Sequence, residues 1–184
     1  SPNKNPDFIG SWIIEPTEIC DQIIDYFEFN KDKQQKGQTA MGYNLDSKDR
    51  MDITIRPKDI IGNGNDIFKN YFESLFECYE DYTEQFLFLK SILLGQKLEI
   101  GWFNIGKYGI GQHYQKLHCE RSTIENIHRV FAFMTYLNDV EEGGGTFFSH
   151  YDLEIKPKKA LTLIWPVEWT HAHKGNVVKS GDKY

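Results

Sequence analysis

The sequence is poor in cysteine, with three cysteines among 184 residues. Cys20, Cys78 and Cys119 are odd in number and lie far apart, which argues against a disulfide framework. A reduced, cytoplasmic setting is therefore the expectation for this chain.

Long apolar runs and an excess of basic residues are also missing. The longest apolar runs are far too short to cross a bilayer, and no N-terminal signal pattern is present, so no membrane partner is expected. Asp and Glu number 27 against 21 Lys and Arg, which gives a net charge of −6. Because attraction to phosphates needs clustered basic residues, nonspecific nucleic-acid binding is disfavoured. An anionic small molecule can still bind through one local cation.

The length suits one domain, residues 1–184, with a substantial core. Hydrophobic residues make up 40% and charged residues 26%, an ordinary globular balance, whereas the aromatic fraction of 15% is high and suits strands around a lined pocket. The chain starts at Ser1 without Met and stops one residue after Lys183, in what reads as the opening of a strand. We therefore expect further residues at both ends. The sequence gives no indication of the oligomeric state.

The first half of the chain carries helical patterns. A helix is expected to begin near Pro16, and a second to run over residues 67–89 with an aromatic stripe that reads as core. Residues 31–50 are rich in Lys, Gln, Asp and Gly and read as a mobile loop, either a lid or a plain solvated loop. Residues 51–55 alternate as a strand, and residues 62–65 read as a turn. The aromatic stripe consists of Phe68, Phe72, Leu75, Phe76, Tyr79 and Tyr82.

From Leu98 onward the apolar period changes to two, which indicates strands. Residues 129–137 are apolar on both faces, as expected of a central strand, and residues 151–155 and 161–165 predict two more strands. Helices followed by short strands predict an α+β, mainly β fold, namely a double-stranded β-helix (jelly roll, cupin-like) with N-terminal supporting helices. The helices would occupy about residues 15–95 and the jelly-roll core about residues 98–184.

Three side chains are candidate metal ligands. His118 and Glu120 are two residues apart, so on an extended strand they share one face and can hold one ion. His173 would complete two imidazoles and one carboxylate, the facial set that leaves positions open on a non-heme Fe(II). Cys119 leaves zinc as an alternative, although it would point to the opposite face and its spacing is unusual for a tetrahedral site. The other alternative is that His118 and Glu120 simply face solvent.

Three motifs follow one another: residues 108–120, residues 136–148 with Glu-Glu-Gly-Gly-Gly-Thr-Phe-Phe, and residues 171–175 with Lys183 beyond them. This ordered set resembles the 2-oxoglutarate- and Fe(II)-dependent dioxygenases, specifically their prolyl 4-hydroxylase-like branch, over residues 108–184. In that branch a Gly stands two residues after the second imidazole and a Lys ten residues after it, which selects His173 over His171. Strand parity leaves His171 as the alternative.

The resemblance also implies a cosubstrate pocket. Tyr108, Thr146 and Lys183 match the residues that bind 2-oxoglutarate, with Lys183 pairing with the distal carboxylate. A surface lysine is the alternative for Lys183. Residues 180–182 read as a hairpin turn that would lay the strand of Lys183 beside the strand of His173.

Two residues are implied to contact a peptide substrate, Tyr114 and Arg129. Packing is the alternative for Tyr114, and an ion pair at a strand end is the alternative for Arg129. At Glu120 the chain departs from the Asp that the branch usually carries. A carboxylate there nevertheless argues against halogenase chemistry, in which a small residue leaves room for chloride.

The resemblance therefore implies an Fe(II)- and 2-oxoglutarate-dependent dioxygenase that hydroxylates an unactivated C–H, with peptidyl proline as the favoured target. The implied cofactors are Fe(II), 2-oxoglutarate, O₂ and ascorbate, and the implied partner is a proline-containing peptide or protein. One alternative is hydroxylation of lysine, a free amino acid or another small molecule. The other is a cupin-like metal-binding module without oxygenase activity, because Glu120 departs from the usual ligand.

Overall fold

The computed structural model of the protein describes residues 7–39, 42–60, 66–93 and 98–184. Its α-helices are α1 (Glu18–Phe29), α2 (Pro57–Ile60), α3 (Asp66–Gln85) and α4 (Leu87–Leu93), and its 3-10 turns are Lys31–Lys33, Ile124–Asn126 and Trp169–His171. Its strands are β1 (Gly10–Ile13), β2 (Gln35–Lys36), β3 (Met51–Ile55), β4 (Phe103–Lys107), β5 (Tyr114–His118), β6 (Phe131–Thr135), β7 (Thr146–Phe148), β8 (Leu153–Ile155), β9 (Leu161–Pro166) and β10 (His173–Gly175).

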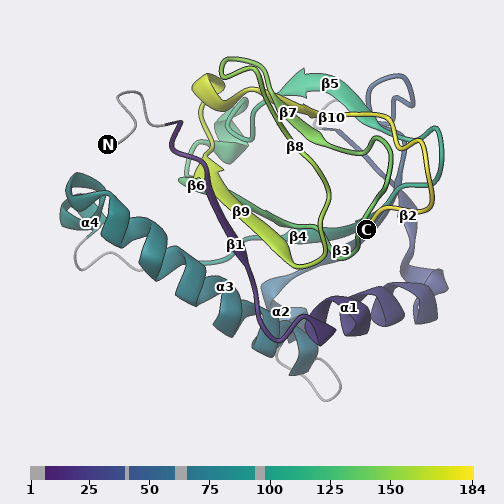
Figure 1. The fold of residues 1–184 in the computed structure, drawn as a ribbon, viewed down its shortest axis with the longest axis horizontal. Coiled ribbons are helices and arrows are strands. Elements are labelled where there is room, and N and C mark those ends of the chain that lie inside the picture. The colour runs from purple at the N-terminus through teal and green to yellow at the C-terminus, as the bar shows by residue number, and fades with distance from the viewer. Residues whose placement is uncertain (1–6, 40–41, 61–65, 94–97) are drawn as a thin grey trace.

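The strands form antiparallel sheets with the orders β1-β9-β6, β5-β10-β7-β8 and β2-β3-β4. The first two sheets face each other (Figure 1). The third sheet lies beside the first, since the ring centroids of Phe103 in β4 and Phe133 in β6 are 6.4 Å apart. Between the facing sheets lies a small core of Tyr136, Phe148, Leu163 and Trp165. The first half of the chain contributes strands as well as helices, because β1 joins β9 and β3 joins β4.

The helices cover the outside of the barrel on one side, where α1 and α3 run along it (Figure 1). The buried residues of α3 recur at intervals of three and four, so they form one stripe along the helix: Phe68, Tyr71, Leu75, Cys78 and Tyr82. Ile19, Cys20, Ile23 and Phe27 do the same on α1. Together with residues of β3 and β9, these stripes form the larger core.

The predicted helical stripe was partly wrong. Phe76 is 56% exposed, whereas Tyr71 and Cys78, which the aromatic pattern omits, are buried. The helix predicted over residues 67–89 is interrupted at Phe86, which separates α3 from α4. The buried positions follow the helical period more strictly than the aromatic residues do, because position on the helix, and not residue type, decides which side chain meets the sheet.

Two strand predictions also need correction. Residues 98–102 form no strand, and β4 begins only at Phe103. Residues 129–137 were expected to be the central strand, but β6 is the edge of its sheet and β9 is central. The burial agrees, since residues 162–165 of β9 are buried in succession whereas every residue of β6 is half-buried.

Residues 31–50 are not a loop throughout. They include the 3-10 turn and β2, and Asp49 pairs with His113 just before β5 through backbone hydrogen bonds of 2.8 and 3.1 Å. Lys48 is only 4% exposed. The end of this segment is therefore part of the barrel wall. The turn predicted at residues 62–65 lies outside the described residues.

Among the helices described, none is both long enough and apolar enough to cross a membrane.

Replacing Phe68 with alanine is expected to lower the free energy of unfolding by about 3–5 kcal/mol, because the side chain is 1% exposed and contacts the rings of Tyr26 and Phe103. Phe29→Ala is the matched control, since Phe29 is 89% exposed and its loss should change stability by less than about 0.5 kcal/mol. Urea denaturation of both variants measures the difference. Equal midpoints would contradict the assignment of Phe68 to the core.

Candidate metal centre and cosubstrate pocket

The two candidate imidazoles meet because β5 and β10 are neighbours. His118 is the last residue of β5, His173 is the first of β10, and the antiparallel register places the two directly opposite each other. Directly opposed residues project to the same face of a sheet, and here the ring centroids are 4.5 Å apart. Glu120 lies two residues beyond His118, in a bend after β5 has ended, and not on a continuing strand as the sequence suggested.

The ligand atoms of His118, Glu120 and His173 converge on one point. All three lie within 4.8 Å of one another, and Glu120 Oε1 is 3.7 Å from the Nε2 atom of each histidine. In the part of the chain that the structure describes, this group of potential metal ligands includes neither His171 nor Cys119. The role of the three residues as ligands remains a prediction, but the structure brings them together.

Hydrogen bonds and burial prepare both imidazoles for a metal. Nδ1 of His118 donates to the Lys116 carbonyl at 2.8 Å, and Nδ1 of His173 donates to the His171 carbonyl at 2.9 Å. Nε2 of each ring is thereby left with a lone pair, which is the usual arrangement of a metal-binding histidine. Burial lowers the pKa of both histidines, and the adjacent His173 lowers the pKa of His118 further. Two neutral imidazoles and one carboxylate form a donor set that fits Fe(II).

His171 is turned away from this point. Its Nε2 lies 2.8 Å from the Asp7 carbonyl oxygen, and its Nδ1 lies 3.0 Å from the Thr170 hydroxyl. Cys119 is half-buried, with its thiol 3.7 Å from the Arg121 carbonyl oxygen. Neither contact leads toward the three converging ligand atoms.

Lys183 lies in a second, adjoining part of the interior. Its backbone forms two 2.8 Å hydrogen bonds with the backbone of Tyr108, so the two residues stand opposite each other. The hairpin prediction was therefore wrong, since Lys183 is paired with Tyr108 after β4 and not with β10. The Lys183 ammonium is 4.8 Å from the centroid of the Tyr108 ring and 5.1 Å from that of Tyr136.

The charge of Lys183 has no carboxylate partner among the described residues. The residue is 5% exposed, and its ammonium donates a 2.6 Å hydrogen bond to the Gly144 carbonyl. Burial lowers its pKa to about 7, and the positive charge of Arg50 acts in the same direction. A buried ammonium in this state is stabilised by an anion, which is what the distal carboxylate of 2-oxoglutarate would supply.

Gly144 makes room for the Lys183 side chain. Its φ is +69°, a conformation that favours glycine, and a Cβ atom there would lie 3.2 Å from Lys183 Cδ. The backbone at Gly144 can therefore approach the Lys183 side chain closely.

Thr146 stands beside both parts of the site. It is the first residue of β7, opposite Gly175, and it shares a face with Phe148, whose ring centroid is 5.4 Å from that of His173. The Tyr136 hydroxyl lies 2.7 Å from Thr146 Oγ1. Tyr136 was not singled out from the sequence, because it reads as one more apolar residue of a strand.

A buried ionic chain was also missed. Lys48, Arg50 and Asp52 alternate along the extended segment that leads into β3, so their side chains share one face. Arg50 Nε is 2.6 Å from Asp52 Oδ1, and Lys48 Nζ is 3.1 Å from Asp52 Oδ2. The alternation was visible in the sequence, but residues 31–50 were read there as a loop, in which alternation has no structural meaning.

The two predicted substrate contacts both lie beside the candidate metal centre. The Tyr114 ring stacks on His118 with a centroid distance of 3.9 Å and an interplanar angle of 18°. Arg129 Nη1 lies 3.3 Å from Glu120 Oε2, and the Arg129 side chain is 41% exposed. Contact with a substrate stays a prediction for both residues.

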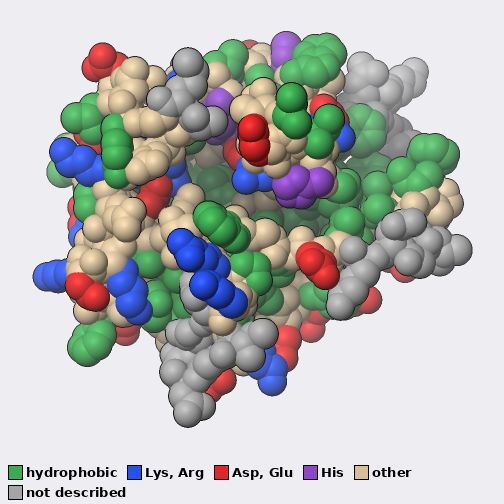
Figure 2. All heavy atoms as spheres, turned by 180° about the vertical axis from the view of Figure 1, so that it is seen from behind, with side chains coloured by type: hydrophobic (Ala, Val, Ile, Leu, Met, Phe, Trp, Pro, Cys, Tyr) green, Lys and Arg blue, Asp and Glu red, His purple; other side chains and the backbone are tan. Residues whose placement is uncertain are grey.

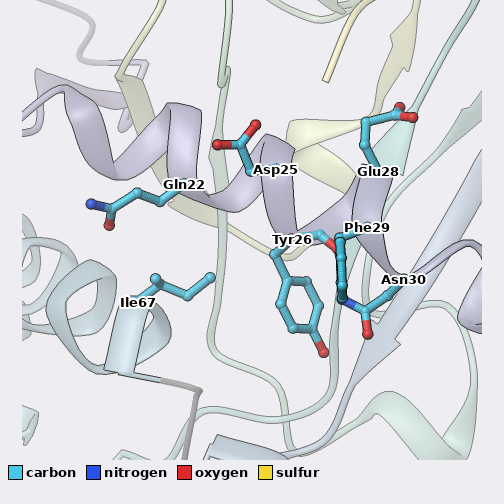
Figure 3. A pocket seen from close by; sticks show the side chains of 7 residues that line it. All are labelled: Gln22, Asp25, Tyr26, Glu28, Phe29, Asn30 and Ile67. Carbon is cyan, nitrogen blue, oxygen red and sulfur yellow. The ribbon is translucent and has the colours of Figure 1, made fainter.

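On the face shown in Figure 2, Lys and Arg side chains are interspersed with acidic and apolar ones. Figure 3 shows the side chains that line a depression beside α1, to which α3 contributes Ile67: Gln22, Asp25, Tyr26, Glu28, Phe29, Asn30 and Ile67. It shares no residue with the candidate metal centre, so it is a separate surface feature.

Solved structures of similar fold settle the class of architecture. A prolyl hydroxylase of Paramecium Bursaria Chlorella virus-1 aligns with a TM-score of 0.67 at 18% identity, covering 96% of this chain and 91% of the other. A prolyl hydroxylase of Trichoplax adhaerens, in complex with a hypoxia inducible factor peptide fragment, aligns with a TM-score of 0.68 at 17% identity, covering 98% and 81%. The jelly-roll fold with supporting helices is thereby confirmed.

The family follows from the sequence comparisons. The family model described as the 2OG-Fe(II) oxygenase superfamily matches residues 103–184. "Probable prolyl 4-hydroxylase 9" of Arabidopsis thaliana is 30% identical over 108 residues, which are 45% of this chain and 38% of the relative. "Prolyl 4-hydroxylase subunit alpha-3" of Homo sapiens is 32% identical over 72 residues, which are 35% of this chain and 13% of the relative.

The matched regions thus span well under half of these two relatives. Residues 103–184 match the family model of the 2OG-Fe(II) oxygenase superfamily, and the resemblance to its prolyl 4-hydroxylase-like branch is confirmed. Fe(II) and 2-oxoglutarate, which give the superfamily its name, are the groups that the converging ligands and the buried Lys183 fit.

Replacing His173 with alanine is expected to weaken binding of a divalent ion by more than about 100-fold, because it removes a direct ligand and the loss of a group that only orients a ligand already costs 10–100-fold. Anaerobic titration with Fe(II) or Co(II) measures this affinity. His171→Ala is the matched control and should retain the wild-type affinity. The reverse result would show that His171 is the ligand.

Proposed function

We propose that this protein is an Fe(II)- and 2-oxoglutarate-dependent dioxygenase that hydroxylates an unactivated C–H of a peptide, with peptidyl proline as the favoured target. The observation that carries the proposal is the convergence of His118, Glu120 and His173 next to a buried lysine that has no carboxylate partner among the described residues. Iron binding alone would require only the three converging ligands. The buried lysine without a carboxylate partner among the described residues is the feature that indicates an anionic cosubstrate.

The reaction balances without a further reductant in each turnover. 2-Oxoglutarate is oxidised and loses CO₂ to give succinate, one oxygen atom of O₂ enters succinate, and the other enters the C–H bond of the substrate. The metal and the cosubstrate supply this oxidative chemistry when bound. Ascorbate is not needed for the balance and remains a prediction.

The residues of the chain would bind and orient the metal and the cosubstrate, and they would exclude water from the centre. His118, Glu120 and His173 would hold the metal on one side and leave its other side open. Lys183, Thr146 and Tyr108 would hold the distal carboxylate, with Tyr136 fixing the Thr146 hydroxyl. Phe148 and Trp165 pack against His173 at centroid distances of 5.4 and 5.2 Å, so buried aromatic rings cover the sheet side of the centre and would limit the access of water.

The substrate class rests on the relatives. Both curated relatives are named as prolyl 4-hydroxylases, and the similar Trichoplax adhaerens structure contains a peptide. Tyr114 and Arg129, beside the metal centre, are the residues that we propose to contact the peptide. Cys20, Cys78 and Cys119 are all free thiols, which supports a reducing, cytoplasmic setting as part of the proposal.

The proposal predicts that 2-oxoglutarate added to the anaerobic Fe(II) protein produces a visible charge-transfer band. With O₂ and a proline-rich peptide, succinate and hydroxylated peptide should form in equal amounts, and His173→Ala should abolish both. Mass spectrometry and a succinate assay measure this outcome. Turnover with free amino acids in place of peptides would favour the small-molecule alternative, and failure to bind 2-oxoglutarate would favour a metal-binding module without oxygenase activity.

The affinity for 2-oxoglutarate should fall as the pH rises above about 7. The pKa of Lys183 in the free protein is about 7, so above that value the side chain must take up a proton before it can pair with the carboxylate. The dissociation constant should therefore increase toward tenfold per pH unit, about the limit for one titrating group. Calorimetry between pH 7 and pH 9 measures the slope.

Lys183→Arg serves as the control for this pH dependence, because an arginine stays charged over the whole range. Its dissociation constant, whatever its absolute value, should depend less on pH. An identical slope in the two proteins would show that another group titrates.

A further inference from the structure

The ionic chain of Lys48, Arg50 and Asp52 ends at the cosubstrate pocket. β3 and β4 pair so that Asp52 lies opposite Gly106 and Met51 opposite Lys107. Continuing this register by one residue places Arg50 opposite Tyr108, and Arg50 Nη1 is 2.6 Å from the Tyr108 hydroxyl oxygen. The ion-paired side chains therefore extend from the barrel wall to Tyr108, a residue of the proposed 2-oxoglutarate pocket.

Two glycines make room for this chain. A Cβ at Gly106 would lie 3.0 Å from Arg50 Cζ, and a Cβ at Gly37 would lie 2.9 Å from Lys48 Cε and 3.1 Å from Asp52 Oδ2. Contacts of this kind are closer than side chains ordinarily make. The wall of the barrel is thus built around these charged groups.

Asp52 holds the Arg50 guanidinium in place through an ion pair to Nε. Asp52 is 6% exposed and Lys48 is 4% exposed, and Lys48 Nζ also donates a 2.9 Å hydrogen bond to the Gln38 carbonyl. With both of its oxygens engaged by cations, the Asp52 carboxylate cannot turn without breaking an ion pair. One buried carboxylate faces two cations here, of which Lys48 is buried and Arg50 has a side chain that is 17% exposed. These three side chains therefore carry one net positive charge near Lys183.

Hydrogen-bond chemistry then fixes the direction of the Tyr108 hydroxyl. A guanidinium has only donors, so the Tyr108 oxygen accepts from Arg50 and its own hydrogen must point elsewhere. Lys183, on the same ring at 4.8 Å, is also only a donor. Among the hydrogen bonds of the described residues, the Tyr108 hydroxyl accepts from Arg50 and donates none. Burial raises the pKa of Tyr108 more strongly than Arg50 lowers it, so the hydroxyl keeps its hydrogen at neutral pH.

We propose that Arg50 is a positioning residue for the cosubstrate: by donating to the Tyr108 oxygen, it directs the Tyr108 O–H toward the carboxylate that Lys183 binds. This inference rests on the proposed function, because it assigns the missing acceptor to 2-oxoglutarate. Arg50 acts through Tyr108, with Asp52 and Lys48 holding its guanidinium in position.

The test is a double-mutant cycle on the dissociation constant of 2-oxoglutarate, measured anaerobically with the Fe(II) protein. Arg50→Met and Tyr108→Phe are each expected to weaken binding by about tenfold, the low end for a hydrogen bond to a charged group. The double variant should bind no more weakly than the weaker single variant, because both changes remove the same directed hydroxyl. The affinity for the metal alone should be unchanged in every variant.

Two results would overturn the inference. Losses that multiply in the double variant would show that Arg50 acts independently of Tyr108, and an unchanged dissociation constant in Arg50→Met would show that it has no such role. If the wild-type protein itself fails to bind 2-oxoglutarate, it is the proposed function that fails, which is a distinguishable outcome.

Two further variants protect the test against misfolding. Arg56→Met, one residue beyond the end of β3, is the matched control and should keep wild-type affinity, since Arg56 lies over the exposed Trp102 ring at 4.8 Å. If Arg50→Met does not give a folded protein by thermal melting, Arg50→Lys takes its place in the cycle. Lysine keeps the charge that pairs with Asp52 but lacks the planar fork that reaches Asp52 and Tyr108 together. The same two outcomes then decide the inference.

Discussion

The structure of the site depends on the register of one short strand, β10. On one side His173 stands opposite His118 of β5, and on the other it stands opposite Phe148 of β7. Lys174, one residue further, lies with its ammonium 5.6 Å from the centroid of the Phe147 ring, on the opposite face. A slip of one residue would therefore exchange an imidazole for a lysine in the interior and separate the ligand atoms. The facing sheet supports the register, since Trp165 of β9 packs against both His173 and Phe148.

The second constraint is the cost of burying charge. Three cations lie close together: Lys48 and Lys183 are buried, and the Arg50 side chain is 17% exposed. Asp52 is the one buried carboxylate beside them in the part of the chain that the structure describes. Aromatic rings and backbone carbonyls contact these cations. The centroid of the Tyr108 ring, for example, is 5.3 Å from Arg50 Cζ and 4.8 Å from Lys183 Nζ. Such contacts reduce the cost of burial without neutralising the charge. A protein has no structural reason to keep this excess, because apolar residues would fill the same space at lower cost. The excess of positive charge therefore supports the proposal that an anion binds here.

The sequence predicted those parts of the site that depend on spacing along the chain. His118 and Glu120 could be paired because they are two residues apart, and His173 could be chosen over His171 because of the Gly and Lys that follow it. It did not predict what depends on register between distant strands. The hairpin at residues 180–182 was the simplest way to bring Lys183 inward, but Lys183 reaches the interior by pairing with Tyr108. Arg50 was missed for the same reason, because its position opposite Tyr108 is set by the pairing of β3 with β4.

The geometry of the site explains how Glu120 can stand where the branch usually has an aspartate. β5 ends at His118, so Glu120 approaches the centre from a bend and not from the pleated strand itself. Its additional methylene group lengthens the reach of the carboxylate, and Oε1 arrives 3.7 Å from both Nε2 atoms. The other oxygen, Oε2, faces Arg129 at 3.3 Å. The two oxygens therefore have different environments, which supports the proposal that Glu120 would offer one oxygen to the metal while Arg129 holds the other. Because Glu120 follows the end of the strand, its longer side chain still reaches both imidazoles, so the glutamate is compatible with the proposed facial set.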